Sequence, residues 1–221
     1  KPRRGNLRLP VQSGAFLTQD TTGVVGAARR ALLELPARHL LSIGDETVWV
    51  DAHRLQSHEG AYGLAVEFET QKSTLLGSHR TSITVPDFSQ PNLLLSDLLL
   101  AYHIEEVPGA INASVIQRGD VAILPAPQAA YGATQPIYLY FGMYNLRQDP
   151  AGETQYTIEA ALVEQADEGR LAQLIDRAFN RRARDGVSVR FEDRGSSADE
   201  ERYIALEATD RSPGTYVVVL R

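Results

Sequence analysis

Alternation of apolar and polar residues dominates this chain, and it is clearest in residues 136–146, which read P-I-Y-L-Y-F-G-M-Y-N-L. In an extended strand, one face of this stretch carries Ile137, Leu139, Phe141 and Met143. The opposite face carries Tyr138, Tyr140, Gly142 and Tyr144. Apolar or aromatic side chains on both faces are typical of a central strand that is covered on two sides. The stretch therefore predicts a buried strand, followed by a turn at 149–152.

Further alternating segments lie on both sides of this strand, about ten residues apart and separated by polar turns. They are residues 47–52, 62–70, 78–85, 93–104, 113–117, 121–124, 155–164, 187–191, 203–208 and 215–220. We expect residues 155–164 to pair with residues 136–146 as a hairpin, because a short turn joins them. Short strands at this spacing are typical of a β-sandwich. Residues 1–20, which proline and glycine interrupt, predict irregular chain.

Two segments follow the helical period instead. In residues 22–35 the apolar side chains recur near 3.6 residues, and Pro36 would end the helix. In residues 168–185 a single apolar stripe is formed by Leu171, Leu174, Ile175, Ala178 and Phe179. Asp167 can cap this second helix, and the cationic residues 177–184 favour its C-terminal end. The pattern thus predicts one or two accessory helices in a β-rich chain.

Two prolines, Pro86 and Pro91, interrupt regular pairing near the middle of the chain. We therefore expect residues 1–90 to contain an N-terminal arm, a helix and a first β-sandwich. Residues 91–221 would form a second β-sandwich with the helix near 168–185 inserted. The predicted fold class is mainly β, with two immunoglobulin-like β-sandwich domains and one or two accessory α-helices.

Composition narrows the classes of function. The 221 residues are 43% hydrophobic and 23% charged, which is ordinary for a folded globular protein. Apolar runs fall far short of the roughly 20 residues that span a bilayer. The net charge of −6 argues against nucleic acid, since phosphate binding needs a clustered basic surface. The chain begins at Lys1, and we expect a signal peptide, an anchor or other sequence to precede it.

Sequence motifs for catalysis are weak. The complete lack of cysteine excludes disulfides, thiol nucleophiles and thiolate metal sites, and it fits an extracytoplasmic bacterial protein. The five histidines include no pair four residues apart, the spacing of a helical zinc site. Ser96 lacks the G-x-S-x-G context of a nucleophile, so Ser96-Asp97 is interpreted as a polar break in a strand, with Asp97 accepting from backbone donors. We predict no catalytic residue, no metal and no cofactor.

Two groups of side chains are candidates for partner binding. The first is the basic start of the chain, which could contact anionic lipid or an acidic partner: Lys1, Arg3, Arg4 and Arg8. The second is the tyrosine face of residues 136–146: Tyr138, Tyr140 and Tyr144. An exposed tyrosine face would suit a protein or sugar partner. We expect instead that a second sheet or the helix near 168–185 covers it.

Several strings together resemble a known family. They are V-P-D-F-S at 85–89, L-L-S-D-L-L-L-A at 94–101, L-P-A-P at 124–127, residues 136–156, and P-G-T-Y-V-V-V-L-R at 213–221. Their order resembles the C-terminal β-sandwich region of bacterial GWxTD-domain proteins, over residues 60–221. The naming motif is absent, since Trp49 stands between Val48 and Val50. The resemblance implies a β-sandwich and a periplasmic or cell-envelope location, and it carries over no catalytic residues.

These observations favour a non-catalytic structural or interaction subunit on the periplasmic side of a bacterial membrane-associated assembly. Its partners would be other protein subunits, as for an extrinsic accessory subunit of a photosynthetic or respiratory complex. One alternative is an extracytoplasmic module that binds carbohydrate or peptide. Another alternative is a hydrolase, for which the sign would be a cleft with two facing carboxylates or a serine backed by histidine.

Overall fold

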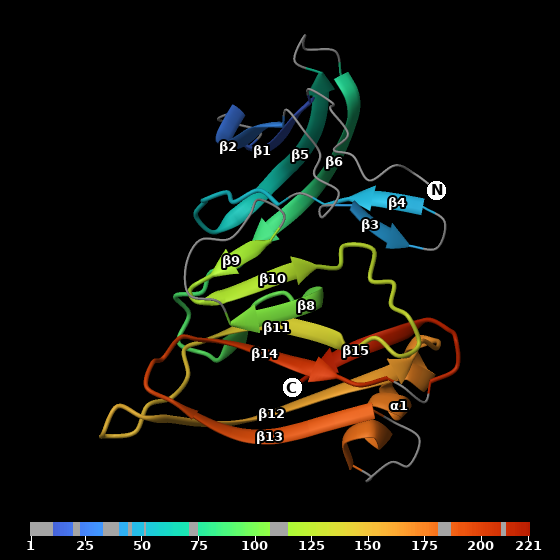
Figure 1. The fold of residues 1–221 in the computed structure, drawn as a ribbon. Helices are drawn as coiled ribbons and strands as arrows, with labels where there is room; N and C mark the ends of the chain where they lie inside the picture. The colour runs from blue at the N-terminus through green and yellow to red at the C-terminus, as the bar shows by residue number, and fades with distance from the viewer. Residues whose placement is uncertain are drawn as a thin grey trace. The chain divides into compact units, whose positions relative to one another are not determined.

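The computed structural model describes residues 11–19, 23–32, 40–43, 46–50, 52–70, 75–106, 115–180, 187–208 and 211–221 (Figure 1). Strands make up most of these residues, every strand pairing is antiparallel, and the protein is mainly β. The described residues fall into two compact units. Unit 1 contains those up to Ser89, and unit 2 contains those from Gln90 onward apart from Val115.

Unit 1 is built on a four-stranded sheet with the order β2-β1-β5-β6. Its strands are β1 (Val11–Gln19), β2 (Gly23–Leu32), β5 (Gly60–Thr70) and β6 (Leu75–Val85). A separate hairpin joins β3 (Leu40–Ile43) and β4 (Glu46–Trp49). The side chains of Ser13, Ala15 and Leu17 alternate along β1 and are 1–3% exposed. This alternation places one face of the sheet in the core of unit 1.

Two sequence predictions in unit 1 are wrong. The helix predicted at 22–35 is wrong over Gly23–Leu32, which form β2 and pair with β1 almost throughout, while 22 and 33–35 lie outside the described residues. Gly23 and Gly26 each disfavour a helix by about 1 kcal/mol, and the long ladder outweighs the weak apolar period. Residues 1–20 are also not irregular throughout, since β1 occupies Val11–Gln19. Its core face, rich in small residues, gave too weak an apolar signal.

Unit 2 contains two sheets. The six-stranded sheet has the order β14-β11-β8-β10-β9, with β7 pairing the end of β11. Its strands are β7 (Leu94–Leu95), β8 (Leu99–Glu106), β9 (Ile116–Arg118), β10 (Val121–Pro125), β11 (Ile137–Tyr144) and β14 (Glu200–Leu206). The three-stranded sheet has the order β13-β12-β15, made of β12 (Thr154–Glu164), β13 (Val187–Gly195) and β15 (Tyr216–Leu220).

The two sheets of unit 2 pack face to face in a sandwich-like arrangement. The shared core combines side chains of β11, β12 and β14 with Leu146, which follows β11. Its buried members are Ile137, Leu139, Phe141, Met143, Leu146, Ile158, Ala160, Leu162, Ile204 and Leu206. β11 lies between β8 and β14 in its sheet, as Figure 1 shows. The predicted central strand at 136–146 is therefore confirmed.

The predicted hairpin between residues 136–146 and 155–164 is wrong. β11 pairs with β14, β8 and β7, whereas β12 pairs with β13 and β15. The turn at 149–152 does form, and Asp149 Oδ1 accepts hydrogen bonds from the backbone N–H groups of Ala151 and Glu153. The segment between β11 and β12 crosses from one sheet to the other. The two strands stack instead of pairing, because each buries its apolar face against the other.

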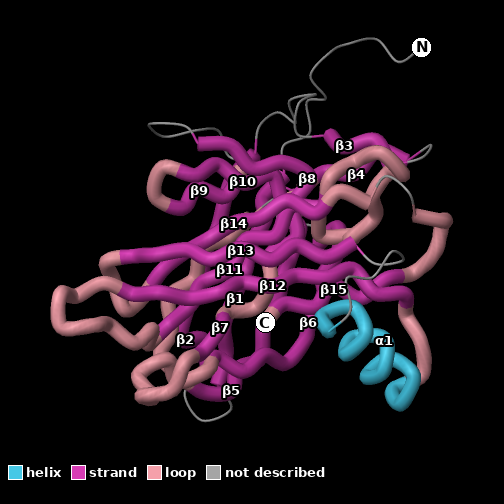
Figure 2. Tube along the Cα trace, turned by 90° about the horizontal axis from the view of Figure 1, so that it is seen from below, coloured by secondary structure: helices cyan, strands magenta, loops and turns pink. Residues whose placement is uncertain are grey.

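The helix α1 (Glu168–Asn180) is the single helix among the described residues and is drawn in cyan in Figure 2. Its apolar stripe packs on the outer face of β12, against Ala161 and Val163. The predicted stripe is confirmed, and residues 181–185 of the predicted helix lie outside the described residues. Since β12 has its inner face in the shared core, α1 forms a third layer over the three-stranded sheet.

The polar break at Ser96 has a defined role in the six-stranded sheet. Residues 96–98 separate β7 from β8, so the predicted single strand at 93–104 is two strands. The Ser96 hydroxyl accepts a 2.8 Å hydrogen bond from the Gly142 N–H, and the Ser96 N–H donates to the Gly142 carbonyl at 2.9 Å. The side chain that satisfies the backbone donor is thus Ser96, where we expected Asp97. These bonds keep the Gly142 backbone paired at the point where β11 passes from its partner β8 to its partner β7.

Candidate functional site

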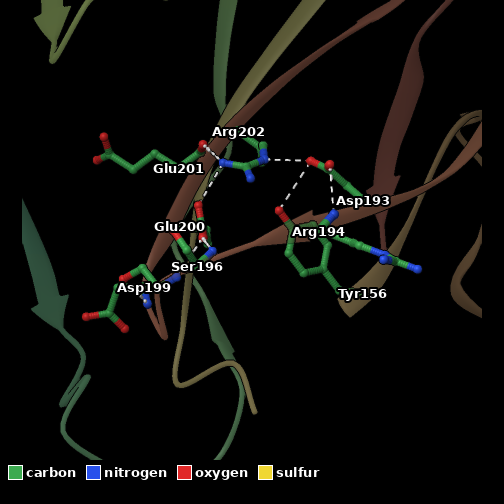
Figure 3. A network of polar contacts seen from close by, with 9 residues as sticks. Tyr156, Asp193, Arg194, Ser196, Asp199, Glu200, Glu201 and Arg202 are labelled. Carbon is green, nitrogen blue, oxygen red and sulfur yellow. Dashed lines mark hydrogen bonds and ion pairs between the residues drawn. The ribbon is translucent and has the colours of Figure 1, made fainter. Parts of the chain in front are cut away.

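One edge of unit 2 is closed by a polar network that joins its two sheets (Figure 3). Arg202 lies on β14 of the six-stranded sheet, and its Nε donates to Asp193 Oδ2 on β13 at 2.8 Å. The Tyr156 hydroxyl on β12 donates to the same oxygen at 3.3 Å, and the Arg202 guanidinium lies 5.7 Å from the Tyr156 ring centre. The hydrogen bond from Arg202 lowers the pKa of Asp193 below its usual value. The network therefore binds β14 to β13 across the layers.

Glu200 completes this closed edge. Its Oε2 accepts from Arg202 at 2.9 Å, and its Oε1 accepts the backbone N–H groups of Ser196 and Ser197 at 3.1 Å. The same carboxylate therefore orders the turn between β13 and β14 and orients the guanidinium. A side-chain carbon at Gly195 would lie 2.0 Å from Glu200 Oε1, so a larger residue there would displace this carboxylate.

The opposite edge of unit 2 is open. A cleft of about 700 Å³ lies beside β15, in the size range of ligand sites. Its apolar floor is formed by Leu100 of β8, Ile137 of β11, Leu162 of β12 and Val218 of β15. The rim comes from two loops: residues 128–133 and 135 before β11, and residues 208 and 211–215 before β15. The cleft is thus an aperture between the two sheets.

The rim combines two tyrosines with one cation. The Tyr131 hydroxyl donates to the Ala101 carbonyl at 3.3 Å, and the Tyr216 hydroxyl donates to the Ser212 carbonyl at 2.7 Å. The Arg211 guanidinium lies 5.9 Å from the Tyr216 ring centre. No aspartate or glutamate belongs to the described cleft lining, so Arg211 gives the rim a positive charge.

The loop beside the cleft carries backbone strain. Ala129 has φ of +48°, in the left-handed region that costs a non-glycine residue roughly 1–2 kcal/mol. Its N–H donates to the Ala126 carbonyl at 2.9 Å, which fixes the turn. Strained backbone is common at binding sites but is not confined to this loop, because Asn145, which does not line the cleft, has φ of +63°.

The predicted tyrosine face lies elsewhere, on the other side of the six-stranded sheet. Tyr140 is 7% exposed and packs with Ala101, Ile104 and Ile123, while Tyr138 and Tyr144 are half-buried. The expected cover by a second sheet or by the helix is wrong for the described part of unit 2. The three-stranded sheet packs on the opposite face of β11, and α1 packs on β12. Tyr144 folds back over Gly142, where a side-chain carbon would lie 2.9 Å from its hydroxyl. The strand thus brings the three tyrosines onto one face, where Tyr138 and Tyr140 pack with side chains of neighbouring strands.

The predicted basic cluster of Lys1, Arg3, Arg4 and Arg8 lies outside the described residues. In the described ranges, no group of three or more histidine, aspartate or glutamate side chains is arranged to hold a metal ion. Nor is any helix in the described part of the chain long and apolar enough to cross a membrane.

A serine backed by histidine does occur, in unit 1. The Ser13 hydroxyl and His53 Nε2 are 3.0 Å apart, within hydrogen-bond distance. Ser13 is 1% exposed, and the adjoining cavity, which Gln12 and Glu67 also line, measures only about 10 Å³. A substrate carbonyl could not reach this hydroxyl, so the pair is interpreted as a structural bond between β1 and the segment after Val50.

Burial of the tyrosines makes a prediction about alkaline pH. Burial raises the pKa of Tyr156 to about 12 and also raises the pKa values of Tyr102, Tyr131, Tyr140 and Tyr203. Unfolded tyrosines deprotonate near pH 10, before the folded ones, so the unfolded state binds fewer protons there. The free energy of unfolding should hold steady from pH 8 to 9 and fall as the pH rises from 10 to 12.

Urea titrations at a series of pH values measure this decline. The chain has only two lysines, Lys1 and Lys72, so lysine titration contributes little to it. Tyr140→Phe should make the decline shallower. A free energy of unfolding that does not change between pH 9 and 11 would contradict the prediction.

The fold and the cleft define a class: a mainly β protein whose second unit is a two-sheet, sandwich-like body, closed at one edge and open at the other. Comparison of the chain with protein families, with curated proteins and with solved structures finds no match. The arrangement of residues in the described units therefore carries the functional argument. The cleft was not predicted from the sequence. The segments at 125–136 and 210–214 contain proline and glycine and so indicated loops, but not that the two loops lie together.

Proposed function

We propose that this protein is a non-catalytic interaction subunit that binds a partner protein through the open cleft of unit 2. The observation that carries the proposal is the cleft itself, with its apolar floor, its two rim tyrosines and Arg211. Tyrosine and arginine are enriched where proteins bind other proteins. An apolar floor with few polar groups favours binding over chemistry, which needs positioned acids, bases or nucleophiles.

We further propose that the protein acts on the periplasmic side of a bacterial membrane-associated assembly. Its sandwich would have immunoglobulin-like topology. The resemblance of residues 60–221 to the GWxTD-domain proteins supports this location, as does the lack of cysteine. An extrinsic accessory subunit of a photosynthetic or respiratory complex would fit the same description.

A second candidate is a module that binds carbohydrate, which the rings of Tyr131 and Tyr216 beside the cleft favour. Sugars stack on exposed aromatic faces, and the glutamine side chains of Gln128 and Gln135 could bond their hydroxyls. A hydrolase is not favoured, because the Ser13–His53 pair is closed to substrate.

The test is affinity purification of the full chain from detergent-solubilised membranes of its native host. Gly132 lines the cleft, and a side-chain carbon there would meet no atom closer than 4.0 Å, so Gly132→Trp should crowd the cleft rim without disturbing the fold. Gly169→Trp is a matched control, since Gly169 is exposed in the first turn of α1 and the space around its Cα is also open.

We expect a partner in equal amount with the wild-type protein and with Gly169→Trp, and its loss with Gly132→Trp. Purification of the protein alone, after release from the membranes by a mild wash, would contradict the subunit proposal. Loss of binding to immobilised oligosaccharides in Gly132→Trp, with no protein partner in any sample, would favour the carbohydrate module.

A further inference from the structure

The two sheets of unit 2 differ in width, and the difference falls at the cleft. The six-stranded sheet continues past β8 to β10 and β9, whereas the three-stranded sheet ends at β15. Leu100 of β8 and Val218 of β15 both line the cleft, so the cleft begins where the narrower sheet stops. Among the described strands, none lies next to β15 on the side away from β12.

The hydrogen-bond register of β15 shows which of its backbone groups point to that open side. Glu159 and Arg221 exchange two backbone hydrogen bonds of 2.8 and 2.9 Å, and the Gln165 N–H donates to the Thr215 carbonyl at 2.9 Å. Because bonded and unbonded positions alternate in an antiparallel ladder, Val217 and Val219 also turn toward β12. The backbone groups of Tyr216, Val218 and Leu220 therefore point outward, giving three N–H donors and three C=O acceptors along an open edge.

The side chains beside this edge specify what kind of strand would fit. Tyr216 and Val218 line the cleft together with Leu162 and Ile137, so every second side chain of an added strand would meet an apolar surface. At the start of β15 the rim carries Arg211, and no described residue forms an ion pair with it. A carboxylate near that end of the added strand would complement this charge.

Resting on the proposed function, we propose that β15 accepts an extended segment of the partner protein as a fourth strand of the narrower sheet. Backbone hydrogen bonds to Tyr216, Val218 and Leu220 hold the segment, as in other cases of strand addition. Alternate apolar side chains of the segment fill the cleft, and an acidic side chain or a C-terminal carboxylate binds Arg211. The loop that contains Ala129 also lines the cleft that receives these side chains.

The test uses synthetic ten-residue peptides with alternating valine or leucine and an aspartate at one end, added to the full chain. Scrambled peptides of the same composition and peptides with asparagine in place of aspartate serve as comparisons. Amide hydrogen exchange followed by NMR should show new protection at Tyr216, Val218 and Leu220. The amides of Val217 and Val219, already bonded to β12, should change little.

Two substitutions separate backbone pairing from side-chain contact. Val218→Pro removes an outward N–H, a change that the free side of an edge strand tolerates, and should weaken peptide binding at least about tenfold. Val218→Ala keeps the N–H and should weaken binding less. Arg211→Gln should remove the preference for aspartate over asparagine and leave the asparagine peptide unaffected.

The outcomes distinguish this inference from the proposed function. If Gly132→Trp abolishes partner capture while Val218→Pro preserves it, the partner uses the cleft without pairing to β15, and the strand inference is wrong. Failure of every alternating peptide to bind, or binding without protection of the three outward amides, also overturns it. If Gly132→Trp leaves partner capture intact, the proposed function itself fails.

Discussion

Truncation of Phe141 to alanine is expected to lower the free energy of unfolding of unit 2 by about 3–5 kcal/mol, the usual cost of Phe→Ala in a core. Phe141 is 1% exposed and is among the largest fully buried side chains of the described residues. It stands on β11 between β8 and β14, where it packs against the three-stranded sheet. The lost phenyl ring would leave a cavity that a strand held on both sides cannot collapse to fill.

Urea unfolding followed by far-UV circular dichroism measures this loss. Phe191→Ala is the matched control: Phe191 packs against the same core from β13 and is only partly buried, so its truncation should cost distinctly less. A cost for Phe141→Ala below about 1 kcal/mol would mean that the two sheets do not share this core.

Replacement of Arg202 by methionine is expected to cost about 2 kcal/mol at neutral pH, because two carboxylates lose a charged hydrogen-bond donor. Glu200 is the more buried of the two, with a side chain 13% exposed, against 39% for Asp193. Methionine retains the apolar stem beside Tyr156, so the variant removes the charge with little loss of packing.

The pH dependence of this variant identifies the cause. Arg202 lowers the pKa of Asp193 in the folded state, so the pair stabilises the fold above pH 4 and its contribution is lost as the pH falls through the lowered pKa. The difference between Arg202→Met and wild type should therefore shrink in acid. Arg194→Met, an exposed neighbour, should cost less than about 0.5 kcal/mol at any pH. An equal cost for both variants would contradict the cross-sheet role of Arg202.

The strands and the helix with strong periodic patterns could be predicted from the sequence. Residues 136–146 and the stripe of α1 were found because each has about ten residues or more in one clear period. β1 and β2 were missed because small residues such as Ser13 and Ala15 carry little hydrophobic signal, while the stability of these strands comes from pairing with each other and with β5.

Strand neighbours and the cleft could not be predicted, for a different reason. β11 and β12 each have an apolar face and two edges that can pair, and a local pattern does not say whether two such strands pair or stack. The cleft is assembled by loops about 80 residues apart in sequence, one around Tyr131 and the other around Arg211. Only the fold brings Tyr131 and Arg211 to one rim.

The two units also differ in the aromatic residues that give the protein its intrinsic fluorescence. The single tryptophan, Trp49, belongs to β4 of unit 1. Eight of the nine tyrosines belong to unit 2, and Tyr62 is the exception. Tryptophan can be excited selectively, so its emission reports on a residue of unit 1, while tyrosine emission is weighted toward unit 2. The unlabelled protein therefore carries a separate fluorescent residue type in each unit.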